Sequence, residues 1–82
     1  MTLLDALLWL VRNEGSLTIR SDHLYIVVRC TVVRQRWKPG YKHIMHDQTI
    51  GYDRTLQPWE ADKLPETIIR CVHEVKEACS AR

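Results

Sequence analysis

The alternation of apolar and polar positions in residues 24–33 is the strongest pattern in the chain. β-branched and aromatic residues dominate this stretch, and no Gly or Pro interrupts it, so it predicts a central β-strand. Because alternate side chains of a strand point to opposite faces, one face would be wholly apolar. That face consists of Leu24, Ile26, Val28, Cys30 and Val32. The opposite face is mixed and consists of Tyr25, Val27, Arg29, Thr31 and Val33. We therefore expect a sheet that helices cover on one side only.

The residues before this strand have the periodicity of a helix. Thr2 and Asp5 have the spacing of a capping box, in which a hydroxyl and a carboxylate satisfy free backbone N–H groups. A first helix is therefore predicted over 3–13, with Gly15 as a left-handed stop after it. The three-and-four spacing places these residues on its inward face: Leu3, Leu7, Leu10 and Val11.

A second helix is predicted at the end of the chain. Residues 58–61 begin with proline and are expected to form a helical turn. The long helix begins at Asp62 or Lys63, where Pro65 is tolerated because it falls in the first turn. One face of this helix is apolar and consists of Leu64, Ile68, Cys71, Val72, Val75 and Cys79.

Two further strands complete the predicted sheet. Residues 17–20 alternate apolar and polar and are joined to the central strand through a turn at Ser21 and Asp22. After the central strand, Pro39-Gly40 suits a type II turn and residues 41–50 return as a third strand, with 51–54 irregular. The order predicts a single α+β domain over 1–82: α-β-β-β-α, with a three-stranded antiparallel sheet and two helices packed on one face.

Composition is that of a folded domain and identifies no partner. Hydrophobic residues make up 45% of the chain and charged residues 27%, with a net charge of +2, which argues against disorder. A protein that imitates nucleic acid would be strongly acidic, so that class is excluded. The cysteine count is odd and no Cys-x-x-Cys spacing occurs, which favours a reduced, cytoplasmic chain. The apolar run at 3–11 follows no basic residue and is too short to span a bilayer, so we expect no membrane contact.

No catalytic or metal-binding motif is present in the sequence. His43 and His46 would point to opposite faces of a strand and could chelate one ion only from a local helical turn. Cys71 and Cys79 are about 12 Å apart along a helix and cannot bond to each other. No nucleophile motif or glycine-rich phosphate loop occurs. We expect a protein that is not an enzyme and holds no cofactor or metal.

The charge asymmetry of the chain lies between Asp22 and Asp47, where cations and aromatic residues occur without a single acid. Arg and Trp are typical anchors of protein interfaces, so this surface predicts the acidic surface of another protein as the partner. The predicted contact residues are Tyr25, Arg29, Arg34, Arg36, Trp37, Lys38, Tyr41 and Lys42. Two alternatives remain: a nucleic-acid-binding module that uses the basic hairpin 29–42, and a solvated hairpin whose charges discourage aggregation.

The first helix has more apolar surface than one sheet can cover. Leu4, Leu8 and Trp9 extend its apolar arc beyond a single stripe. A homodimer would bury this excess through Leu4, Leu8 and Trp9. The alternative is a monomer in which the last helix, or Trp59 and its neighbours, covers the same residues.

Two resemblances follow from these features. The helix, three strands, helix order is similar to that of double-stranded RNA-binding domains, which implies their topology. The chain lacks their basic motif at the start of the final helix, where Asp62-Lys63-Leu64-Pro65-Glu66 stands, and has Ser21-Asp22-His23 in place of their loop. In size, compactness and lack of motif the chain also resembles small phage and prophage accessory proteins, including anti-CRISPR inhibitors. That resemblance implies stoichiometric binding to a host complex.

Overall fold

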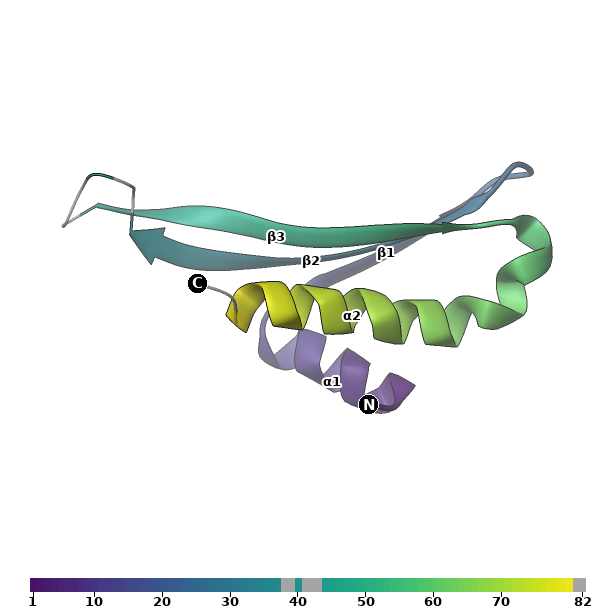
Figure 1. Ribbon diagram of the computed structural model, residues 1–82, viewed down its shortest axis with the longest axis horizontal. Helices are drawn as coiled ribbons and strands as arrows, with labels where there is room; N and C mark the ends of the chain where they lie inside the picture. Colours follow the sequence, from purple (N-terminus) through teal and green to yellow (C-terminus); the bar gives the residue numbers. More distant parts are fainter. Residues whose placement is uncertain (38–39, 41–43, 81–82) are drawn as a thin grey trace.

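The protein folds as one helix, a three-stranded meander and a final helix, which confirms the predicted α+β order. A computed structural model describes residues 1–37, 40 and 44–80 (Figure 1). Its elements in chain order are α1 (Leu3–Arg12), β1 (Ser16–Ser21), β2 (Ile26–Trp37), β3 (Met45–Leu56), a 3-10 helix η1 (Pro58–Lys63) and α2 (Leu64–Ser80).

The sheet is antiparallel with β2 in the centre, between β1 and β3. Arg29 of β2 pairs with Thr18 of β1 on one side and with Asp53 of β3 on the other. The β1 pairing ends where Ser16 meets Thr31, whereas the β2–β3 ladder continues to the end of β2. The far half of that hairpin is therefore two-stranded and extends the molecule along its 50 Å long axis (Figure 1).

Both helices lie on the same side of the sheet (Figure 1). Helix α2 packs directly on β2 and β3, and α1 packs against α2. The expected apolar face of β2 is buried from Ile26 to Val32, and the expected stripe of α2 is buried around Cys71 and Val72. The core formed in this way consists of Ala6, Leu10, Ile26, Val28, Cys30, Val32, Ile68, Cys71, Val72 and Val75.

Leu24 corrects the predicted central strand at its start. It precedes β2 and is 61% exposed, although the alternation pattern assigns it to the buried face. Its backbone N–H is bonded to the Asp22 carboxylate in the turn, so the chain has not yet entered the ladder at this point.

The inward face of α1 also differs from the prediction. The capping box forms as expected: the Asp5 N–H donates to Thr2 Oγ1 at 3.1 Å, and the Thr2 N–H donates to Asp5 Oδ2 at 3.0 Å. The buried side chains, however, are Ala6 and Leu10. Leu7 and Val11, expected to face inward, are exposed, with Val11 at 75%. The physical reason is that α1 packs chiefly against α2 and not against the sheet, so the helix turns Ala6 and Leu10 inward in place of Leu7 and Val11.

Glu14, and not Gly15, adopts the left-handed conformation after α1. Glu14 has a φ of 54°, and Gly15 does not have a positive φ. The role of Gly15 is close approach, because a Cβ there would lie 2.6 Å from Leu10 Cδ2 and 3.1 Å from Val32 Cγ2. The prediction that a glycine is needed at position 15 agrees with this close approach, but the predicted reason, a left-handed backbone, is wrong.

The third strand ends later than predicted. It runs over Met45–Leu56 and includes residues 51–54, which were expected to be irregular. Gly51 pairs with Thr31 and Asp53 pairs with Arg29, so cross-strand pairing outweighs the weak strand propensity of glycine. Gly40 has a φ of 82°, as the predicted type II turn requires. The remaining turn residues, 38–39 and 41–43, lie outside the described part of the chain.

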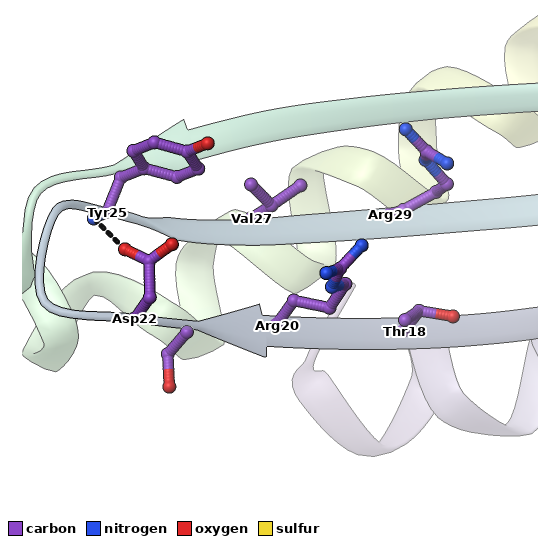
Figure 2. A pocket seen from close by; sticks show the side chains of 7 residues that line it. Thr18, Arg20, Asp22, Tyr25, Val27 and Arg29 are labelled. Carbon is purple, nitrogen blue, oxygen red and sulfur yellow. Dashed lines mark hydrogen bonds between the residues drawn. The ribbon is translucent and has the colours of Figure 1, made fainter.

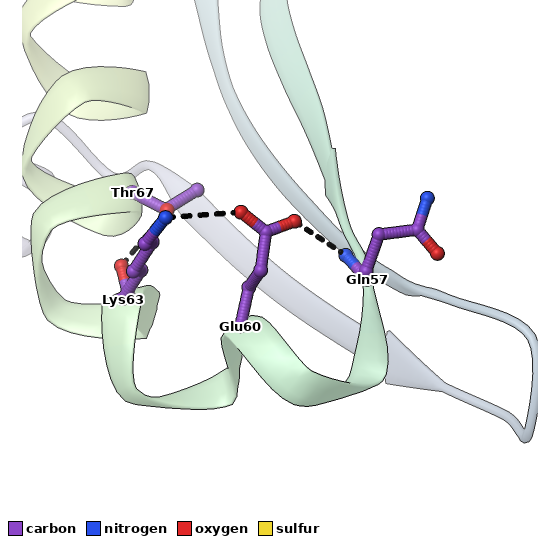
Figure 3. A network of polar contacts seen from close by, with 4 residues as sticks. All are labelled: Gln57, Glu60, Lys63 and Thr67. Atoms are coloured by element: carbon purple, nitrogen blue, oxygen red, sulfur yellow. Dashed lines mark hydrogen bonds and ion pairs between the residues drawn. The ribbon is translucent and has the colours of Figure 1, made fainter.

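The junction between β3 and α2 is held by a polar network around Glu60 (Figure 3). Pro58 occupies the start of η1 as predicted, and Glu60 accepts hydrogen bonds from the Gln57 N–H at 3.1 Å and from Lys63 Nζ at 3.2 Å. These bonds, the backbone bond first, hold the pKa of Glu60 below its usual value. Thr67 Oγ1 donates to the Lys63 carbonyl at 2.9 Å. The network fixes the point at which the chain turns back under the sheet.

The left-handed backbone of Glu14 and the close packing at Gly15 lead to a prediction about the free energy of unfolding. Gly15→Ala should destabilise the protein by about 1–3 kcal/mol, because the added Cβ overpacks a filled site. Glu14→Gly should stabilise it, since relief of about 1–2 kcal/mol of left-handed strain exceeds the about 0.4–1 kcal/mol that unfolded-state entropy costs. Urea unfolding of both variants measures the two changes. A loss of stability in Glu14→Gly would contradict this assignment.

Candidate functional site

The sheet has one face that no helix covers, and we call it the open face. It is opposite the buried residues of β2, and the pairing register identifies its members on all three strands. They are Ser16, Thr18 and Arg20 on β1, Val27, Arg29, Thr31, Val33 and Gln35 on β2, and Asp47, Thr49, Gly51, Asp53 and Thr55 on β3. Both helices lie on the other side of the sheet (Figure 1). The mixed face predicted for the central strand is thus available for contact.

A depression of about 440 Å³ lies at the end of the open face beside the β1–β2 turn. Figure 2 shows Tyr25, Val27 and Arg29 in a row, with Arg20 of β1 beside them. The complete lining is Thr18, Arg20, Ser21, Asp22, Tyr25, Val27 and Arg29. An aromatic ring, an aliphatic side chain and two guanidinium groups therefore share one small surface.

The turn that carries Tyr25 is fixed by its own hydrogen bonds. Asp22 Oδ1 accepts from the Leu24 N–H at 2.7 Å and from the Tyr25 N–H at 3.1 Å. The Asp22 N–H donates to the Tyr25 carbonyl at 3.1 Å. Such a side-chain turn holds the backbone without help from the core. Tyr25, which is 44% exposed, is thus presented at the rim of the depression by an ordered backbone.

Arg29 forms an ion pair on the open face, and it is the only one to do so among Tyr25, Arg29 and Arg34, the predicted contact residues whose side chains the structure describes. Its Nη2 lies 3.2 Å from Asp53 Oδ2, and both side chains are more than half exposed. Exposed pairs of this kind are worth about 0–1 kcal/mol. Asp53 therefore orients Arg29 across the sheet but binds it weakly, so a carboxylate from outside can compete for the guanidinium.

Arg34 corrects the predicted contact surface. It lies an odd number of residues from Arg29 on β2, so strand alternation places it on the helix side. Its Nη2 donates to Asn13 Oδ1 at 2.6 Å, and Asn13 Nδ2 donates to the Trp9 carbonyl at 2.7 Å. Arg34 thus ties β2 to the C-terminal end of α1, where a cation also complements the helix dipole. It is a structural residue and does not share a face with Tyr25 and Arg29.

The other predicted contact residues follow Arg34 along the hairpin. Arg36 and Trp37 end β2 and are paired with His46 and Met45. Lys38, Tyr41 and Lys42 lie outside the described residues, as does His43. The structure adds Arg20, which sequence reasoning missed. Its register opposite Val27 could have identified it once β1 and β2 were paired as a hairpin.

The residues predicted for a dimer contact do not form one surface. Leu4 and Leu8 are exposed, but Trp9 is partly buried and packs against the hydrophobic core. The Trp9 carbonyl also accepts the bond from Asn13. Trp9 therefore belongs to the interior side of α1, because the helix is rotated from the predicted orientation.

Two buried thiols belong to the core. Burial, with a smaller contribution from the other cysteines, raises the pKa of Cys30 to about 11, and burial also raises the pKa of Cys71. The Cys71 thiol donates a weak hydrogen bond to the Val28 carbonyl at 3.9 Å. A buried neutral thiol is a poor nucleophile and behaves as a small apolar side chain. Among the residues the structure describes, no group of three His, Cys, Asp or Glu could hold a metal ion.

Comparison of the chain with protein-family models, with curated proteins and with solved structures gave no match. Within residues 1–37, 40 and 44–80, no helix is long and apolar enough to cross a membrane. The site must therefore be interpreted from its own geometry.

The two arginines should differ in their effect on folding. Arg34→Ala should destabilise the protein by about 1.5 kcal/mol or more, because it removes a partly buried, charge-assisted hydrogen bond and leaves Asn13 without that donor. Arg29→Ala should cost less than about 1 kcal/mol, because its pair is exposed. Thermal unfolding of both variants tests the difference, and equal losses would contradict the assignment of Arg34 to a structural role.

Proposed function

We propose that this protein is a small, non-enzymatic binding protein that docks through its open face on a larger host protein or ribonucleoprotein complex. The observation that carries the proposal is the depression where Tyr25, Val27 and Arg29 lie beside Arg20 (Figure 2). Tyr and Arg dominate the binding energy of protein interfaces, where they cluster in central, desolvated positions. Three paired strands and a hydrogen-bonded turn hold these groups, so little conformational entropy is lost when they bind.

The chemistry of the surface indicates what the partner presents. Arg20 and Arg29 offer two guanidinium groups, and the exposed Asp53 pair is weak enough to be exchanged. An acidic patch next to an apolar side chain would satisfy both arginines and cover Val27 and Tyr25. This mode of action, stoichiometric occupation of a surface in the cytoplasm, is that of phage- and prophage-encoded inhibitors such as anti-CRISPR proteins, which the chain resembles in general character.

Charge reversal on the open face tests the proposal. Tagged protein should retain a specific partner from a bacterial lysate, and Arg29→Glu or Arg20→Glu should reduce that retention at least about tenfold, since repulsion replaces attraction at a close charge pair. Tyr25→Ala should reduce it as well. Arg70→Glu is the matched control, because Arg70 is an exposed arginine on α2, away from the open face.

Nuclease treatment of the same lysate separates the two classes of partner. Retention that survives nuclease and is lost in the open-face variants supports the proposal. Retention that nuclease abolishes, with an affinity that falls steeply as salt rises, would favour nucleic-acid binding through residues 29–42 instead. Retention that is equal in Arg29→Glu and Arg70→Glu would overturn the assignment of the open face.

A further inference from the structure

Helix α1 carries a second apolar stripe, on the side that faces away from the core. Four of its residues follow the spacing i, i+3, i+4, i+7, which is one continuous face of a helix. Their exposed fractions are 65% for Leu4, 37% for Leu7, 38% for Leu8 and 75% for Val11. The buried stripe of the same helix runs through Ala6 and Leu10. In Figure 1 the helix lies at the margin of the molecule, on the side opposite the open face.

The charges beside this stripe are arranged in a complementary way. Asp5 and Arg12 are both exposed and are seven residues apart, so they lie about two turns and about 10 Å apart along the same flank of the stripe. Asp5 is held by the capping box, which keeps its carboxylate ionised and lowers its pKa. Arg12 makes no ion pair with any residue that the structure describes. One flank therefore has a negative end and a positive end.

We infer that α1 pairs antiparallel with α1 of a second copy of this chain, about a twofold axis between Leu7 and Leu8. In that arrangement Leu4 of each copy faces Val11 of the other, so the stripe covers itself. The same flank of both helices meets, and Asp5 of each copy comes within two residues of the level of Arg12 of the other, about 3 Å along the helix axis. A twofold interface requires this self-complementarity. A parallel twofold pair would place this flank of the two copies at opposite edges of the contact, where Asp5 and Arg12 could not pair.

The size of the stripe sets the expected strength of the contact. Standard protein interfaces use about 20 to 30 residues a side, and this stripe is far smaller, so we expect self-association in the micromolar range or weaker. The contact lies on the helix side of the sheet, so it leaves the open face of both copies uncovered. Self-association and the proposed partner binding therefore use different surfaces.

A pair of charge variants tests the antiparallel arrangement. Arg12→Glu makes the flank entirely acidic and Asp5→Lys makes it entirely basic, so each variant alone should self-associate at least about tenfold more weakly. An equimolar mixture should recover the association, because every facing pair is then of opposite sign. Sedimentation equilibrium from micromolar to millimolar protein measures this. Arg70→Glu is the control for a change of net charge, and it should associate as the parent chain does.

Other measurements keep the outcome interpretable. Far-UV circular dichroism and thermal unfolding show whether Asp5→Lys, which also breaks the capping box, keeps its fold, and Leu8→Glu should abolish association without touching that box. A parent chain that stays monomeric at millimolar concentration would overturn the inference, as would charge variants that do not complement each other in the mixture. Neither result bears on the partner binding of the open face, which Arg29→Glu tests separately.

Discussion

The contact between α2 and β2 is the interaction on which the rest of the structure depends. Cys71, Val72 and Val75 of α2 are fully buried, and so are Val28 and Cys30 of β2. These side chains are small, so the helix approaches the sheet closely, and α1 then packs on the outer surface of α2. Once this contact is made, the alternation of β2 fixes both of its faces: from Ile26 to Val32 every second residue is buried, and the residues between them form the opposite face.

The alternation of β2 also decides which arginines lie on the same face of the sheet. Arg29 and Arg34 belong to the same basic segment of the sequence, yet the strand sends them to opposite sides. Arg34 bonds to Asn13 on the helix side, while Arg20, on the preceding strand and outside the basic segment, lies with Arg29 at the depression of the open face. A charge cluster in the sequence of a strand is thus divided between two surfaces, and the surface that results takes its members from the neighbouring strand.

Sequence reasoning succeeded where one element carries its own signal. The α2 stripe, the Thr2 capping box and the three-stranded meander follow from periodicity and spacing that act within a few residues. It failed where the outcome depends on what an element packs against. The orientation of α1 was set by α2, and the extension of β3 through Gly51 was set by pairing with Thr31. The open face could be predicted as mixed, but the depression beside Tyr25 required the register of β1.

The chemical reactivity of the two buried thiols depends on how often α2 separates from the sheet. Cys71 lies on α2 and Cys30 on β2, on the two sides of the contact that organises the fold. With the pKa of Cys30 near 11, almost no thiolate exists at neutral pH, and burial keeps reagents away from both sulfurs. Modification of either sulfur therefore requires α2 to separate from the sheet. The rate at which Cys30 and Cys71 are alkylated therefore measures the free energy of that separation in the native chain.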